Sequence, residues 1–127
     1  MTKIFNKILR LAEFGKDLNR LSRKFRTLEE DLETFISNQL KLTHKLKIEN
    51  KDVIRMSDLG IDYPHIYKAR KFSCRALKGK GGASGIRIMY AYYPDKDMIE
   101  FIEIYYKDDQ AKEDRSRILF KYSNKPK

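Results

Sequence analysis

The sequence predicts an α+β fold in which an N-terminal αα-hairpin packs on a small antiparallel β-sheet and a short helix follows near the C-terminus. Two observations predict it: apolar residues recur at helical spacing in the N-terminal third, whereas β-branched and aromatic residues are concentrated in the second half. The length of 127 residues suits a single domain spanning 1–127. We expect its last residues, 122–127, to form a flexible tail.

Two sets of apolar residues predict the two helices of the hairpin. Both sets recur at the spacing of one helical face: Phe14, Leu18, Leu21 and Phe25, then Leu28, Leu32, Phe35, Ile36 and Leu40. Thr27 and Glu30 fit a capping box, in which Thr27 is the N-cap and Glu30 bonds back to it. The pattern of residues 4–11 leaves open whether they form a strand or the start of the first helix.

The second half of the chain predicts strands. Three segments are rich in β-branched and aromatic residues: 66–73, 85–93 and 98–106. A turn at 93–97 makes the last two an antiparallel hairpin, and a further short strand is expected at 53–56. Residues 41–64 are otherwise expected to be a long connection, and 111–122 a terminal helix. The sheet should therefore have three or four strands.

Positive charge is concentrated in one part of the sequence. The net charge is +10, and residues 63–94 contain seven Lys and Arg residues but no Asp or Glu. Such a concentration of cations attracts polyanions. Four of these residues are expected to contact RNA phosphates: Lys71, Arg75, Lys78 and Lys80.

Strand alternation predicts which polar side chains share a face. Ile86, Ile88 and Tyr90 should point toward the helices together with Ile102 and Ile104. The opposite face can remain open. Six side chains are then expected to meet there in a cleft: Lys68, Arg70, Arg87, Glu103, Tyr105 and Lys107.

A cleft with several cations suits a phosphodiester. RNA can be cleaved without a metal by its own 2′-hydroxyl, given a base, an acid and cations that stabilise the charge on phosphorus. Arg70 and Arg87 are candidates for binding the phosphate, because a guanidinium can contact two phosphate oxygens. No metal or cofactor is expected, since His44, His65 and the single Cys74 do not form a zinc-type ligand set.

Four side chains are candidates for proton transfer or base binding. Lys68 or Lys107 could lose a proton near neutral pH, because neighbouring cations disfavour the charged form. Glu103 is a candidate base, or alternatively a structural anchor for an arginine. Tyr105 could stack on a base.

Several segments together resemble the RelE/ParE superfamily of toxins from toxin–antitoxin pairs. The resemblance extends from about Leu9 to Tyr122. It is carried by "RLAEFGKDLNRLSRKFRTLEEDLETF", "YKAR", "SGIRIMY" and "FIEIYYK" followed by "EDRSRI", in that order. "SGIR" followed by a tyrosine-containing strand is the most specific of these pieces.

The RelE branch of this superfamily implies a ribosome-dependent mRNA endonuclease that needs no metal. The resemblance carries over four basic positions: Lys68, Arg70, Arg87 and Lys107. Glu113 falls near a position often held by a catalytic tyrosine or histidine, so the sequence departs from the pattern there. The alternatives for that role are Tyr105, Glu103 and Glu113 itself.

The resemblance also implies partners, and the composition favours a location. The expected partners are mRNA on the ribosome and a cognate antitoxin of acidic character. The single cysteine and the lack of a long apolar run favour the cytoplasm and no membrane contact. Two alternatives stay open: a non-catalytic inhibitor of DNA gyrase, as in the ParE branch, and an inactive RNA-binding relative. The basic residues favour the nuclease.

Overall fold

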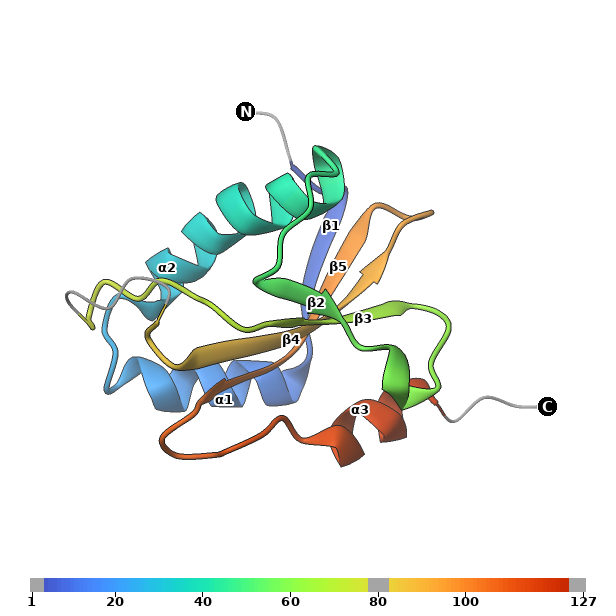
Figure 1. Cartoon of the computed structure of the whole chain (residues 1–127). Helices are drawn as coiled ribbons and strands as arrows, with labels where there is room; N and C mark the ends of the chain where they lie inside the picture. Colours follow the sequence, from blue (N-terminus) through green and yellow to red (C-terminus); the bar gives the residue numbers. More distant parts are fainter. Residues whose placement is uncertain (1–3, 78–82, 124–127) are drawn as a thin grey trace.

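The computed structural model describes residues 4–77 and 83–123 and shows an α+β fold around a five-stranded mixed sheet (Figure 1). The strand order is β1-β5-β4-β3-β2. The strands are β1 (Lys7–Arg10), β2 (Val53–Arg55), β3 (His65–Ala69), β4 (Ile86–Tyr93) and β5 (Met98–Tyr106). The helices are α1 (Ala12–Ser22), α2 (Leu28–Phe35), η1 (Ile36–Lys45), η2 (Ser57–Leu59) and α3 (Arg115–Tyr122).

The helices α1 and α2 bury the apolar residues that the sequence singled out. Every residue of the two predicted sets is buried: Phe14, Leu18, Leu21, Phe25, Leu28, Leu32, Phe35, Ile36 and Leu40. The Phe14 ring stacks on Phe101 of β5 with ring centroids 5.1 Å apart. This packing stabilises one face of the sheet against the helices.

The second helix is longer than the sequence predicts. It continues from α2 into η1, whose wider π-helical turns end where the Leu46 N–H bonds to the Lys41 carbonyl (Figure 1). The connection expected from residue 41 therefore begins only after Lys45. Thr27 is the N-cap residue, as expected, but the side-chain bonds of a capping box are absent, because the Thr27 hydroxyl donates to Asp31 and accepts the Ala76 N–H.

The N-terminal strand changes the expected sheet. β1 pairs with β5 in parallel, from Lys7 opposite Met98 to Arg10 opposite Phe101. Residues 7–10 are thus a strand, and the sheet is not purely antiparallel. The order of apolar residues in β1 contains no information about the direction of its partner, so this pairing was not predictable locally.

A β-bulge reassigns the faces of β5. Met89 lies opposite Glu103, but the next residue, Tyr90, lies opposite Phe101, so Ile102 is the extra residue. Ile104 packs in the helix-facing core, whereas Ile102 packs on the other face. The expectation that these two isoleucines share a face is therefore wrong.

The second face of the sheet is covered and not open. A second apolar cluster lies between this face, α3 and the segment around η2, and its buried members are Met56, Leu59, Ile61, Ile66, Met89, Ala91, Ile102, Ile118 and Tyr122. Tyr122 is therefore part of the core and not of a tail; residues 124–127 lie outside the described residues. No helix in the described part of the chain is long and apolar enough to cross a membrane.

Two predicted elements are shorter than expected. β3 ends at Ala69 and does not continue to residue 73. Directly after its end, the Arg70 N–H bonds to the Asp52 carbonyl. α3 begins at Arg115 and not at residue 111, because the Asp114 carboxylate caps it by accepting the Arg117 N–H at 3.1 Å.

Candidate functional site

Four side chains with acid–base or phosphate-binding chemistry gather on the second face of the sheet. They are Lys68 from β3, Arg87 from β4, Tyr105 from β5 and Glu113 from the segment before α3, and we call them the Lys68 cluster. The register explains the first three, because Lys68 lies opposite Met89 while Arg87, two residues from Met89, lies opposite Tyr105. Glu113 joins them because the chain folds back across this face after β5.

Lys68 and Glu113 form a largely buried ion pair. The Lys68 Nζ lies 2.8 Å from Glu113 Oε1, and the side chains are 17% and 3% exposed. Arg115 Nε donates to the other carboxylate oxygen at 3.1 Å. Burial alone would raise the pKa of Glu113, but the hydrogen bond and charge of Lys68 outweigh it and lower the pKa. The Glu113 carboxylate is therefore ionised at neutral pH, and Lys68 makes it a weaker base than an ordinary glutamate.

Tyr105 provides a protonated group next to this pair. Its hydroxyl is buried and makes no well-aligned hydrogen bond with the described residues. Burial raises the pKa of Tyr105, and the charges of Lys68 and Arg87 offset only part of that effect. The Lys68 ammonium lies close enough to interact with this hydroxyl, so Tyr105 is polarised by Lys68 and is able to give a hydrogen bond to a ligand or a reacting group.

Arg87 is the cation of the cluster that remains available. Its side chain is partly exposed, and no acidic side chain of the described residues pairs with it. It lies directly opposite Tyr105, which is its register partner on the neighbouring strand β5. A guanidinium in this position can bind a phosphate beside the Lys68–Glu113 pair.

Glu103 holds backbone and an amide side chain, which is neither of the two roles that the sequence analysis offered, a base or an anchor for an arginine. It is buried on the same face and accepts hydrogen bonds from the Asp114 N–H and from Gln110 Nε2, both at 2.8 Å. Burial raises the pKa of Glu103, although these bonds and the charge of Arg117 oppose the rise. Glu103 therefore anchors the backbone that presents Glu113, rather than an arginine side chain.

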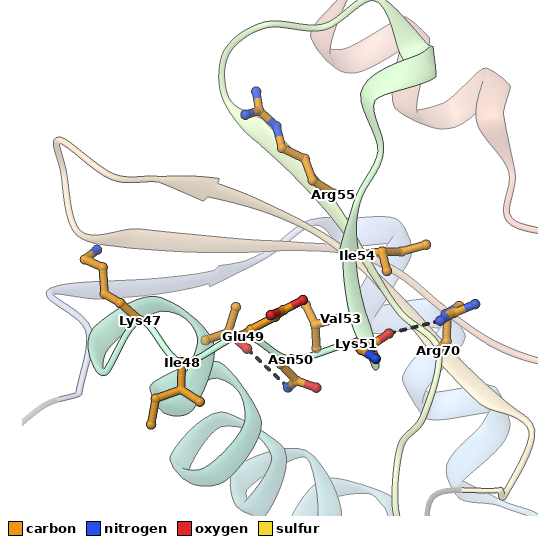
Figure 2. Close-up of a pocket in the computed structure, with 10 residues that line it drawn as sticks. Lys47, Ile48, Glu49, Asn50, Lys51, Val53, Ile54, Arg55 and Arg70 are labelled. Carbon is orange, nitrogen blue, oxygen red and sulfur yellow. Dashed lines mark hydrogen bonds between the residues drawn. The ribbon is translucent and has the colours of Figure 1, made fainter.

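Other predicted residues lie outside the cluster. Arg70 follows the end of β3 and donates to the Lys51 carbonyl at 3.0 Å, which places it in a cavity beside β2 (Figure 2). Lys107 is exposed at the end of β5, where its N–H bonds to the Gly85 carbonyl. The predicted meeting of six side chains in an open cleft is thus wrong, because α3 covers the face and Arg70 lies at its edge.

The predicted RNA-binding lysines and arginine are also dispersed. Arg75 pairs with Asp31 and Glu30 at the start of α2. Lys71 is exposed just after β3. Lys78 and Lys80 lie outside the described residues.

Arg115 is a site residue that the sequence analysis missed. It bonds to Glu113 and also pairs with Asp58 at 3.0 Å, so it connects the cluster to η2. The run "EDRSR" contained the signal, since an acid and an arginine two residues apart can pair outside a helix. The contact with Asp58 had no local signal.

Comparisons with protein-family models, with curated proteins and with solved structures found no match to this chain. Among the described residues, no three His, Cys, Asp or Glu side chains are placed to hold a metal ion. The functional argument therefore depends on the residues of the Lys68 cluster and their surroundings.

Proposed function

We propose that this chain is a toxin of the RelE type, a metal-independent endoribonuclease that cleaves mRNA at the ribosome, and that the Lys68 cluster is its reaction centre. The observation that carries the proposal is the buried Tyr105 hydroxyl next to the Lys68–Glu113 ion pair, with Arg87 unpaired on the neighbouring strand. A base, an acid and two cations are the groups that RNA self-cleavage needs. The chain's net charge of +10 also suits binding to a polyanion and to an acidic antitoxin.

The reaction follows from these positions. Glu113 accepts the proton of the 2′-hydroxyl, and the 2′-oxygen forms a bond to phosphorus while the bond from phosphorus to the 5′-oxygen breaks. Tyr105 gives a proton to the departing 5′-oxygen, and Arg87 and Lys68 stabilise the charge on the phosphate oxygens. The products are a 2′,3′-cyclic phosphate and a 5′-hydroxyl end.

Expression of matched variants tests the proposal. Wild type should arrest growth and create new mRNA 5′ ends, which can be mapped after induction. Arg87→Ala should slow cleavage about a hundredfold, the usual cost of removing a group that stabilises transition-state charge. Arg23→Ala is the control, because Arg23 is exposed after α1. Equal cleavage by wild type and Arg87→Ala would remove the central residue of the proposal.

One observation favours a non-catalytic alternative. The Lys68 charge is already neutralised by Glu113, as in a structural ion pair. A protein of this kind would inhibit a protein target such as DNA gyrase, or would bind RNA without cleaving it. Intact mRNA together with DNA damage after induction would support the gyrase inhibitor, and intact mRNA with RNA binding would support the inactive relative.

A further inference from the structure

The strand β2 forms a free edge of the sheet. It pairs with β3 on one side, and the order of the described strands ends with it. An edge strand presents unpaired backbone groups that can bind another extended chain. A cavity lies beside this edge.

The register shows which backbone groups of β2 face outward. The Arg70 N–H bonds to the Asp52 carbonyl and the Met56 N–H to the Ile66 carbonyl, so residues 52, 54 and 56 face β3. Val53 and Arg55 therefore face the free edge. The Val53 N–H is bonded within a turn to Asn50, which leaves the Val53 carbonyl and both backbone groups of Arg55 without a partner among the described residues.

A cationic cavity of about 670 Å³ lies along this edge. Four of its lining residues are basic and one is acidic: Lys47, Lys51, Arg55, Arg70 and Glu49 (Figure 2). Figure 2 shows Lys47 and Arg70 on opposite sides of the strand, with Arg55 near its far end. The two hydrogen bonds of Arg55 and Arg70 go to backbone carbonyls of Asp62 and Lys51, so neither cation is neutralised by a carboxylate.

The lining favours a peptide over a nucleic acid. Ile48 is exposed and Ile54 partly exposed beside the cations, and apolar side chains of an added strand can pack there. None of the ten lining residues is aromatic, whereas single-stranded nucleic acids are bound largely by stacking on aromatic rings. Unpaired backbone groups likewise match a peptide backbone.

We propose that the β2 edge binds an extended, acidic segment of a partner protein, which adds as a sixth strand to the sheet. The partner's backbone pairs with Val53 and Arg55, and its carboxylates contact Lys47, Lys51, Arg55 and Arg70. The proposal does not depend on the Lys68 cluster being catalytic, because none of the four residues of that cluster lines the cavity.

A synthetic peptide tests the interaction. The probe is a fluorescein-labelled peptide of sequence Thr-Glu-Val-Glu-Val-Glu-Thr, capped at both ends, and binding to the full chain is measured by fluorescence anisotropy. The double variant Lys51→Glu, Arg55→Glu should weaken binding by about tenfold or more, since it replaces attraction by repulsion. Lys16→Glu is the matched control on an exposed residue of α1 and should leave affinity within about twofold.

Two further measurements separate strand addition from charge attraction alone. Peptide binding should slow hydrogen exchange of the Arg55 amide about tenfold or more, because the added strand pairs with it. A peptide with N-methyl groups on alternate backbone amides should bind at least about tenfold more weakly than the unmodified probe. Unchanged hydrogen exchange at Arg55 or equal affinity for the methylated peptide would each overturn the proposal. So would a single-stranded RNA that binds more tightly than the peptide and loses its binding in the double variant Lys51→Glu, Arg55→Glu.

Discussion

At the scale of single residues, the Lys68–Glu113 pair determines how the candidate site behaves. Two opposite charges with little exposure to water stabilise the fold only while both are present, because removing one leaves the other buried without compensation. The same arrangement lowers the pKa of Glu113, so its carboxylate stays ionised to a lower pH than an ordinary glutamate does. A reaction centre and a structural pair therefore make different predictions for activity but the same prediction for stability.

Lys68→Met should lower the free energy of unfolding at pH 7 by about 2–3 kcal/mol, because Glu113 loses its buried partner. The double variant Lys68→Met, Glu113→Gln should recover part of this loss. Urea denaturation of the four proteins in this cycle measures the coupling. Glu113 has a lowered pKa in the folded state, so its contribution is present above its usual pKa and is lost as the pH falls through the folded value. If the free-energy losses of the single variants Lys68→Met and Glu113→Gln simply add in the double variant, the two side chains are not coupled.

His44 makes the stability of the fold depend on pH. Its ring is buried, its Nε2 lies 2.7 Å from the Tyr90 hydroxyl, and it stacks on Tyr92 at a centroid distance of 4.0 Å. Burial, with the nearby charges of Lys47 and His65, lowers the pKa of His44 to about 4. Between this value and the ordinary value of 6.5, the unfolded chain binds a proton that the folded chain excludes.

The free energy of unfolding should therefore fall as the pH drops from 7 to 4, by roughly 2–3 kcal/mol from this residue alone. His44→Gln should flatten the profile between pH 6.5 and 4, as measured by urea unfolding at a series of pH values. His65→Gln should change the profile less, because that ring at the start of β3 is only partly buried and contributes less than burial does to the low pKa of His44. A His44→Gln profile as steep as the wild-type profile would exclude the buried ring as the cause.

At the scale of elements, α3 depends on its first residues. Asp114 caps the helix with its side chain, and its own N–H is held by Glu103. Asp114→Ala should destabilise the protein by about 1 kcal/mol, because the Arg117 N–H loses its acceptor. Ser116→Ala, on an exposed residue of the same helical turn, should change the urea midpoint little. An equal effect of the two substitutions would contradict the capping role.

The sequence predicted the elements whose signals are local. The positions of α1 and α2 follow from apolar spacing, and β4 and β5 follow from alternation around a turn. The π-helical continuation through Lys45 and the bulge at Ile102 were missed, since both depend on how a helix or strand fits its neighbours. The parallel pairing of β1 was missed for the same reason.

The candidate site divides in the same way. Lys68, Arg87 and Tyr105 share a face because of alternation and register, which a sequence can predict. Their burial depends on α3 and Glu113 folding across that face, which periodicity does not predict. Arg75 shows the limit of charge counting, since its acidic partners come from α2, more than forty residues earlier in the chain.

At the scale of the whole molecule, the net charge of +10 predicts RNA binding that depends on salt. The dissociation constant for a 20-nucleotide RNA should rise about tenfold or more between roughly 50 and 200 mM NaCl, because bound phosphates release counterions. The double variant Lys71→Glu, Lys107→Glu should reduce this salt dependence, since both lysines are exposed just after the strands β3 and β5 that carry Lys68 and Tyr105. Lys16→Glu provides the comparison on α1. Affinity that is independent of salt would exclude a phosphate-driven interaction.

The pairing of β1 with β5 sets an order of events during synthesis. Asn6 and Asp97, 91 residues apart, are joined by hydrogen bonds just before these strands begin. While the nascent chain emerges, α1 and α2 are complete long before β4 and β5 exist to cover their apolar faces. Closing so distant a contact is slow compared with local folding. The apolar faces of these two helices must therefore remain exposed, and open to chaperones or to aggregation, until the residues of β5 have left the exit tunnel.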